Sequence, residues 1–170
     1  MDFKKYIRDV NDFPNQGVVF KDITPLLLDA EAFQKAAHAL YDLLKDKKIA
    51  KVVGLESRGF FFAPLLAAKL NAGFVPIRKQ GKLPYQVERV SYALEYGSDT
   101  LEIHKDSIHP GDKVLVHDDV LATGGTAAAA CELITRLGGE IVQCNFLIEL
   151  DFLNGRNKLK GHNIASLVHY

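Results

Sequence analysis

A short apolar strand, two adjacent acidic residues and a glycine-rich turn follow one another in residues 114–126 of this chain, VLVHDDVLATGGT. The run Val114-Leu115-Val116 is typical of a buried parallel strand, whose C-terminal end faces a ligand crevice. The turn at 123–126 runs into a series of alanines, so we predict that it opens onto a helix. This succession predicts a strand–turn–helix unit with polar groups gathered at the turn.

The turn has the properties of a phosphate site. Its glycines let backbone N–H groups converge, because glycine adopts conformations closed to other residues, and the positive end of the following helix favours an anion. We therefore expect phosphate to contact Ala122, Thr123, Gly124, Gly125, Thr126 and Ala127. Taken alone, the turn is better explained as a simple helix cap, with Thr123 or Thr126 as the capping residue. The acid pair before it favours a ligand site, because adjacent like charges are unfavourable without a cation or hydrogen-bond donors.

Asp118 and Asp119 precede this turn, and as acids they would repel the phosphate itself. We expect them to accept hydrogen bonds from vicinal hydroxyls or to hold a divalent cation. Ribose 5-phosphate offers both a phosphate and vicinal hydroxyls. The sequence therefore predicts a site for a phosphorylated sugar.

Composition indicates one globular domain, residues 1–170. The chain is 48% hydrophobic and 25% charged, and its 21 basic residues balance 21 acidic ones, so no overall field attracts nucleic acid or an anionic membrane. The longest apolar stretch, 60–68, is too short to span a bilayer, and the charged N-terminus does not read as a signal peptide. We expect a cytoplasmic protein without nucleic-acid or membrane partners, in which Cys131 and Cys144 are buried thiols.

Strands and helices alternate along the chain, which predicts an α/β fold: a central, mostly parallel sheet with helices on both faces. We expect a helix from a cap at Asp29 to about Lys48. Two strand–helix–strand units should follow, at 52–55, 60–70 and 74–77, and at 114–116, 127–137 and 141–148.

The long excursion at 79–111 is interpreted as a flap, because long loops are often lids. It contains a predicted hairpin, 92–95 with 100–103. A last apolar run, 164–168, is either an edge strand or a tail that packs on a neighbour.

The strand, acid pair and A-T-G-G-T resemble the sugar-diphosphate signature of type I phosphoribosyltransferases, and they match neither a P-loop nor a dinucleotide fingerprint. Within that family the chain resembles the adenine phosphoribosyltransferases. Four segments are similar to their base-binding, pyrophosphate, basic and flap segments, namely 13–23, 54–60, 77–84 and 91–97. The resemblance covers nearly the whole chain. It implies the type I fold with a flexible hairpin flap, a small hood formed by the N- and C-terminal segments, a base-binding region at 1–29 and a homodimer.

By this resemblance the chain transfers a phosphoribosyl group from phosphoribosyl pyrophosphate (5-phospho-α-D-ribose 1-diphosphate) to adenine, giving AMP and pyrophosphate in purine salvage. Mg²⁺ would be held mainly by the diphosphate, and no direct protein ligand is assigned to it. The chemistry itself needs cations around the leaving diphosphate and carboxylates near the ribose. We expect the diphosphate to contact Ser57, Arg58, Arg78, Lys79 and Lys82.

The resemblance also implies individual roles. Glu95 would lie over the base, where it accepts or relays the proton of the purine N9, and Arg58 would lie near the purine ring as well as the diphosphate. Phe20 and Leu150 would cover the two faces of adenine, and backbone groups of Val19 and Lys21 would contact its edge. A cis peptide bond is expected between Glu56 and Ser57.

Two positions depart from the family pattern: His117, where an aliphatic residue is usual, and Gln80 within the basic loop. We interpret His117 as a buried, hydrogen-bonded core residue, the alternative being a pH-sensitive neighbour of Asp118. Two other functions share the signature. A 6-oxopurine phosphoribosyltransferase would act on hypoxanthine, guanine or xanthine, and a phosphoribosyl-pyrophosphate-binding transcriptional regulator would bind without turnover.

Overall fold

Two units make up the chain in the computed structural model, Met1–Ala39 and Leu40–Tyr170, and the structure describes residues 1–44, 46–93 and 97–170. The first unit holds η1 (Phe3–Tyr6), an antiparallel hairpin of β1 (Arg8–Asn11) and β2 (Val19–Asp22), and α1 (Thr24–Leu28). Two ion pairs join residues that lie opposite each other in this hairpin, Arg8 with Asp22 and Asp9 with Lys21, and opposite charges in such positions stabilise strand pairing.

Helix α2 (Ala30–Asp42) begins in the first unit and ends in the second. The predicted cap is confirmed, since Asp29 Oδ1 accepts a hydrogen bond from Ala32 N at 2.8 Å. The predicted end at about Lys48 is wrong. After α2 the chain turns, with Leu44 N donating to Tyr41 O, and side-chain amides of β8 (Glu140–Glu149) bind backbone carbonyls here: Asn145 donates to that of Leu40 and Gln143 to that of Leu43.

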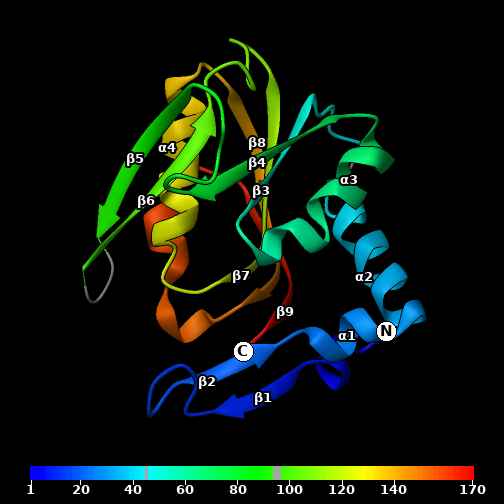
Figure 1. Ribbon diagram of the computed structural model, residues 1–170. Helices are drawn as coiled ribbons and strands as arrows, with labels where there is room; N and C mark the ends of the chain where they lie inside the picture. The colour runs from blue at the N-terminus through cyan, green and yellow to red at the C-terminus, as the bar shows by residue number, and fades with distance from the viewer. Residues whose placement is uncertain (45, 94–96) are drawn as a thin grey trace. The chain divides into compact units, whose positions relative to one another are not determined.

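A seven-stranded sheet forms the centre of the second unit, in the order β5-β6-β4-β3-β7-β8-β9 (Figure 1). Five of its strands run parallel, and the β5–β6 hairpin joins one edge in antiparallel pairing. The strands not yet defined are β3 (Lys51–Leu55), β4 (Gly73–Lys79), β5 (Val87–Ala93), β6 (Ser98–His104), β7 (Lys113–Leu121) and β9 (Ile164–His169). This arrangement confirms the predicted mostly parallel sheet.

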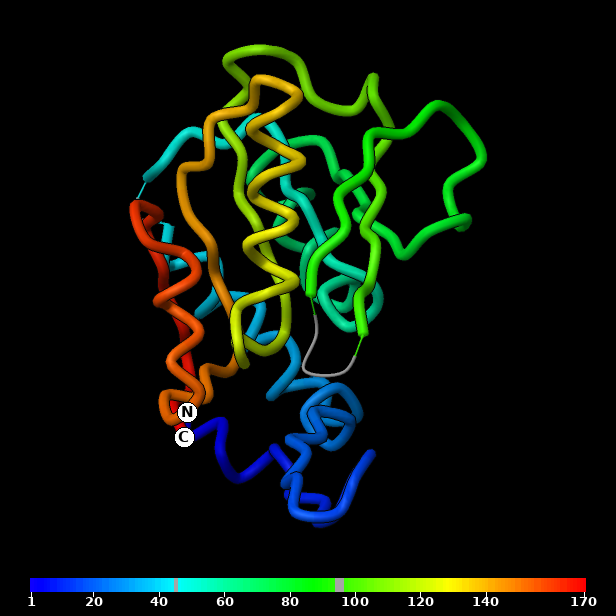
Figure 2. The backbone as a smooth tube through the Cα atoms, turned by 90° about the vertical axis from the view of Figure 1, so that its left-hand side faces the viewer, coloured from blue at the N-terminus to red at the C-terminus, as the bar shows by residue number. Residues whose placement is uncertain are grey.

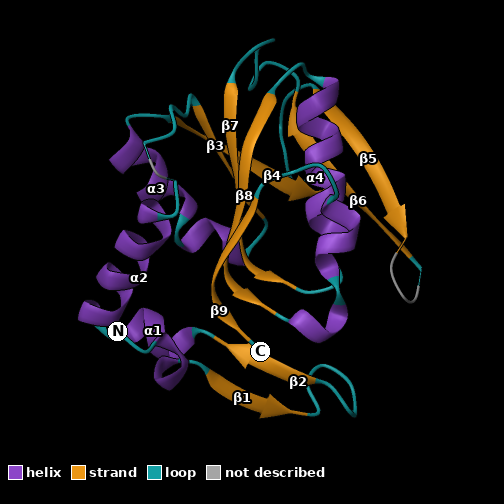
Figure 3. Ribbon diagram, turned by 180° about the vertical axis from the view of Figure 1, so that it is seen from behind, coloured by secondary structure: helices purple, strands orange, loops and turns teal. Residues whose placement is uncertain are grey.

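Helices cover both faces of the sheet, as predicted (Figure 3). From β3 the chain passes through η2 (Arg58–Phe61) and α3 (Ala63–Leu70) to β4 on one side, whereas from β7 it passes through α4 (Gly125–Arg136) to β8 on the other. Right-handed crossovers in opposite directions place α3 and α4 on opposite faces. Strands β3 and β7 are therefore the point at which the strand order reverses, where α/β sheets bind ligands.

Strand β7 is longer than its predicted core of 114–116, and the acid pair lies within it. Pairing with β8 continues past the acids, with Asp118 opposite Phe146 and Val120 opposite Ile148, so ladder hydrogen bonds hold this segment extended. The apolar run at 164–168 is an edge strand, β9, paired parallel to β8. After β8 come two short helices, η3 (Asp151–Leu153) and η4 (Gly155–Leu159).

Aliphatic side chains of the sheet and of α4 form the core of this unit, among them Val53, Val116 and Ile134. Cys131 and Cys144 belong to the same cluster and are free thiols with their sulfur atoms 3.6 Å apart, as expected of buried cysteines. Among the described helices, none is long and apolar enough to cross a membrane.

His117 is fully buried in β7, and its Nδ1 lies 2.7 Å from Asn145 Oδ1, which confirms the interpretation as a hydrogen-bonded core residue. The ring of Phe62 meets the imidazole edge-on. Burial lowers the pKa of His117 to about 4, although the hydrogen bonds with Asn145 act in the opposite direction. The folded protein therefore holds this imidazole neutral.

Replacement of His117 by glutamine should change how the free energy of unfolding depends on pH. The unfolded chain takes up a proton near pH 6.5, while the folded chain does so only near pH 4, so stability falls as the pH is lowered through this window and levels off below it. The wild type should lose up to about 3 kcal/mol more than His117→Gln between pH 7 and 4. Urea unfolding at several pH values measures the difference, and parallel profiles would contradict the assignment.

Candidate active site

The turn between β7 and α4 forms a small pocket, lined by Asp118, Val120 and every residue from 121 to 127. Its volume of about 70 Å³ is far below that of a drug-sized ligand site, so it fits a group of phosphate size. Gly124 caps the helix with a φ of 80° and provides no side-chain hydrogen bond. The first helical N–H bonded to a carbonyl of this turn is that of Ala128, which leaves the preceding N–H groups available to an anion.

A second segment fixes the shape of this turn. A Cβ atom added to Gly124 would collide with the carbonyl oxygen of Gly155, and one added to Gly155 would collide with that of Ala122. Both glycines are therefore required by the close approach of η4 to the turn. In addition, Leu150 N donates to Leu121 O at 2.9 Å, which ties the end of β8 to the end of β7.

Asp118 and Asp119 are adjacent acids within β7, close to its C-terminal end. Burial and the charge of Asp119 raise the pKa of Asp118 well above its ordinary value. Burial also raises the pKa of Asp119, although the Arg58 guanidinium opposes this, with its Nε 3.0 Å from Asp119 Oδ2. Two carboxylates that are hard to ionise together are suited to hydroxyl donors or to a cation.

Gly59 brings the turn after β3 onto the acid pair. A Cβ at Gly59 would lie 2.9 Å from the His117 carbonyl oxygen and 3.1 Å from Asp118 Oδ1, which is closer than ordinary side chains permit. This turn contains Ser57, and its peptide bond from Glu56 is cis, as predicted. The structure thus brings together the predicted pyrophosphate loop and the predicted ribose acids.

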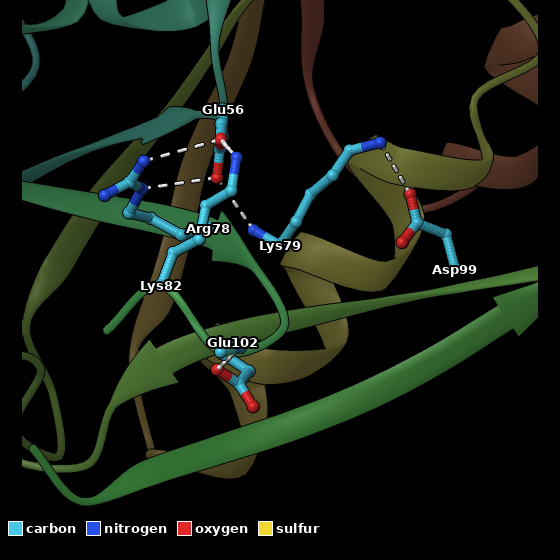
Figure 4. Close-up of polar contacts among 7 residues, drawn as sticks. Glu56, Arg78, Lys79, Lys82, Asp99 and Glu102 are labelled. Atoms are coloured by element: carbon cyan, nitrogen blue, oxygen red, sulfur yellow. Dashed lines mark hydrogen bonds and ion pairs between the residues drawn. The ribbon is translucent and has the colours of Figure 1, made fainter. Parts of the chain in front are cut away.

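The Glu56 side chain contacts three residues of the basic loop 77–84, and the sequence analysis assigned it no role. Arg78 Nε donates to its Oε2 at 3.2 Å, Lys79 N donates to the same oxygen at 2.9 Å, and Lys82 pairs with its Oε1 (Figure 4). The Glu56 side chain is only 7% exposed. Its place between a buried strand and the predicted Ser57 was the signal that could have identified it.

These contacts keep the Glu56 carboxylate ionised. Burial alone would raise the pKa of Glu56, but hydrogen bonds from Lys82, the Lys79 N–H and Arg78 outweigh it and hold the pKa at about 2. The Lys79 ammonium points away from this group and pairs with Asp99 at 3.0 Å (Figure 4). Arg58, Arg78, Lys79 and Lys82 therefore each have a carboxylate partner.

The residues predicted to contact adenine come from both units. Val19, Phe20 and Lys21 belong to β2 of the first unit, where the Phe20 ring meets Phe13 edge-on at 5.0 Å between centroids. Leu150 follows β8 in the second unit. Glu95 lies outside the residues that the structure describes.

One group of His and acidic residues within the described chain has the spacing of a metal site: Glu149, Asp151 and His169. Arg156 forms two hydrogen bonds with the Glu149 carboxylate, and Ser166 forms a third. The pKa of Glu149 is lowered, because these hydrogen bonds outweigh the effect of burial. We interpret this group as an ion-pair network.

Comparison with known proteins agrees with this geometry. A family model described as phosphoribosyl transferase domain matches residues 26–162. The chain is 62% identical to the adenine phosphoribosyltransferase of Christiangramia forsetii over 100% of its own length and 99% of that protein. It is also similar to two crystal structures of such enzymes. That from Thermoanaerobacter pseudethanolicus has a TM-score of 0.97 and 47% identity, over 99% of this chain and 98% of that one. The structure from Saccharomyces cerevisiae is complexed with an imino-altritol bisphosphate and adenine. It has a TM-score of 0.92 and 43% identity, over 97% of this chain and 96% of that one.

Replacement of Glu56 by glutamine should tighten the binding of pyrophosphate. The amide keeps the shape of the side chain but removes a negative charge beside the cations of the basic loop, which strengthens their attraction for an anion by about threefold to tenfold in Kd. Calorimetric titration with magnesium pyrophosphate measures the effect. The matched control is Glu140→Gln. This change breaks an ion pair with Lys113 at the first residues of β7 and β8, at the other end of β7 from the phosphate turn. Unchanged or weaker binding by Glu56→Gln would contradict the prediction.

Proposed function

The chain belongs to the adenine phosphoribosyltransferase family, and from this premise we propose how its own residues divide the work of the reaction. The enzyme transfers the 5-phosphoribosyl group of 5-phospho-α-D-ribose 1-diphosphate to adenine, with AMP and pyrophosphate as products. The observation that carries the proposal is the meeting of three groups where the strand order reverses: a phosphate-sized pocket, an acid pair and a cluster of cations.

The sugar phosphate is held at both ends. The N–H groups at the start of α4 and the turn 122–127 bind the 5′-phosphate, and Asp118 and Asp119 accept hydrogen bonds from the ribose hydroxyls. The raised pKa values of both acids support this role, because hydroxyl donors would stabilise carboxylates that burial disfavours.

The leaving group is held by the cations. As the anomeric C–O bond breaks, negative charge builds up on the diphosphate, and Arg58, Arg78, Lys79 and Lys82 stabilise it together with donors at Ser57. Arg58 also pairs with Asp119, so it joins the diphosphate to the ribose. Glu56 pairs with Arg78 and Lys82 before the substrate arrives, so the diphosphate competes with its carboxylate for these two cations.

Magnesium fits this site as a companion of the substrate. Oxygen ligands are those that Mg²⁺ prefers, and a dication would relieve the repulsion within the coupled pair Asp118–Asp119. When bound, the ion neutralises part of the charge of the diphosphate, which remains its main ligand. The protein then supplies the orientation and the exclusion of water around the anomeric carbon.

The base and proton roles come from the family resemblance. Val19, Phe20 and Lys21 of the first unit and Leu150 of the second are the proposed adenine contacts. Arg58 is also proposed to lie near the purine ring. Glu95 is proposed to accept or relay the proton of adenine N9 as it attacks the anomeric carbon.

A homodimer in the cytoplasm completes the proposal. Apolar side chains of neighbouring elements are exposed, Phe61 in η2 to 43%, Leu65 in α3 to 42% and Phe74 in β4 to 37%, and such a face suits a second copy of the chain. Phosphoribosyl pyrophosphate and AMP are phosphorylated metabolites that do not cross membranes, which supports a cytoplasmic location.

Purified protein with Mg²⁺ and phosphoribosyl pyrophosphate should release pyrophosphate when adenine is added, and not with hypoxanthine, guanine or xanthine. Turnover with an oxopurine alone would keep the reaction type but overturn the base. Binding of the sugar diphosphate without turnover on any base would favour a regulator instead.

Glu95→Gln should lower kcat by about 10²-fold or more with folding intact, because general acid–base groups contribute at least this much. Steady-state kinetics and a thermal melt measure both properties. The control is Glu88→Gln in β5 of the same hairpin, which pairs with Arg136 and should keep its turnover. An unchanged kcat for Glu95→Gln would reject its role.

A further inference from the structure

Two side chains from distant segments flank the first residue of α4. A Cβ atom added to Gly125 would lie 3.6 Å from a ring carbon of Tyr92 and 3.7 Å from the Nζ atom of Lys158. Figure 2 shows the backbone of α4 between the β5–β6 hairpin and the segment that contains η4. An ammonium and a phenol therefore lie near the start of α4, next to the phosphate pocket, although neither side chain lines that pocket.

The backbone sets the direction from which the exposed Lys158 side chain approaches α4. Gly155 begins η4, and the turn approaches it so closely that glycine is required at both 124 and 155. Residues three apart lie on the same side of a 3₁₀ helix, so Lys158 projects from the side of η4 that Gly155 presses against the turn. The contact of Gly155 with Gly124 thus directs the lysine toward the start of α4.

The charge of Lys158 lacks a carboxylate partner within the described part of the chain, unlike the four cations proposed for the diphosphate. The start of a helix carries partial positive charge, and a cation there is destabilised. An ammonium held at this place becomes favourable when an anion lies between it and the helix.

Tyr92 is the second side chain near Gly125. Its hydroxyl lies 3.1 Å from Thr126 Oγ1, and its ring lies 3.6 Å from where a Cβ of Gly125 would be. The Thr126 side chain is thereby oriented from β5, a strand that lies within the predicted flap 79–111.

We propose that Lys158 is a further binding residue for the 5′-phosphate of the substrate and the product, with Tyr92 positioning Thr126 beside it. This inference rests on the proposed function, because it assigns a phosphate to the pocket of residues 121–127. Lys158 adds a charge-assisted hydrogen bond to the backbone N–H groups, and such bonds are stronger than neutral ones. Its ammonium acts at the phosphate end of the ribose, away from the cations of the diphosphate.

The test compares Lys158→Met with Lys158→Arg, which keeps the charge, and with Lys160→Met as a matched exposed lysine just beyond η4. Calorimetry measures the Kd of ribose 5-phosphate and of magnesium pyrophosphate for each folded variant. Lys158→Met should weaken ribose 5-phosphate about tenfold or more, because hydrogen bonds to charged groups contribute this much, and should leave pyrophosphate unchanged. Lys158→Arg should retain most of the affinity, and Lys160→Met should match the wild type.

Equal affinity of Lys158→Met and wild type for ribose 5-phosphate would overturn the inference, as would a parallel loss for pyrophosphate. Adenine turnover by the wild type separates the two proposals. If the wild type turns over adenine while Lys158→Met binds ribose 5-phosphate normally, only the role of Lys158 fails. If the wild type neither binds ribose 5-phosphate nor turns over adenine, the proposed function fails as well.

Discussion

The approach of Gly59 to the backbone of β7 is the contact on which the site depends. A side chain at this position would press on the His117 carbonyl and the Asp118 carboxylate, so only glycine lets the turn after β3 rest on the acid pair. This contact brings Arg58 to Asp119 and joins two turns that lie far apart in the sequence. The fold makes the contact possible because β3 and β7 are neighbours at the reversal of the strand order.

Charge within the site is balanced rather than simply positive. The four cations near the sugar site each face a carboxylate, and Glu56 alone holds two of them. A bare cluster of cations would repel itself and bind any anion, whereas paired cations favour a ligand of high charge that can compete with their carboxylate partners. The buried imidazole of His117, which precedes the acid pair in β7, is neutral and adds no charge to this balance.

The sequence was sufficient for the parts of the structure set by local pattern. The run 114–126 predicted the strand, the acids and the turn, because glycine and hydrophobic patterning act over a few residues. It did not predict the end of α2 at Asp42, near which Asn145 and Gln143, from a strand a hundred residues later, bind backbone carbonyls. The pairing of Glu56 with Lys82 and the approach of Gly155 to Gly124 are also non-local, and an isolated acid or glycine gives no sign of such partners.

A crystal structure with bound ribose 5-phosphate tests the central claim most directly. The account predicts the phosphate at the start of α4, within hydrogen-bond reach of the N–H groups of residues 125–127, and the ribose hydroxyls at Asp118 and Asp119. A phosphate bound at Arg78 and Lys82 instead, with the turn between β7 and α4 making no contact, would contradict it.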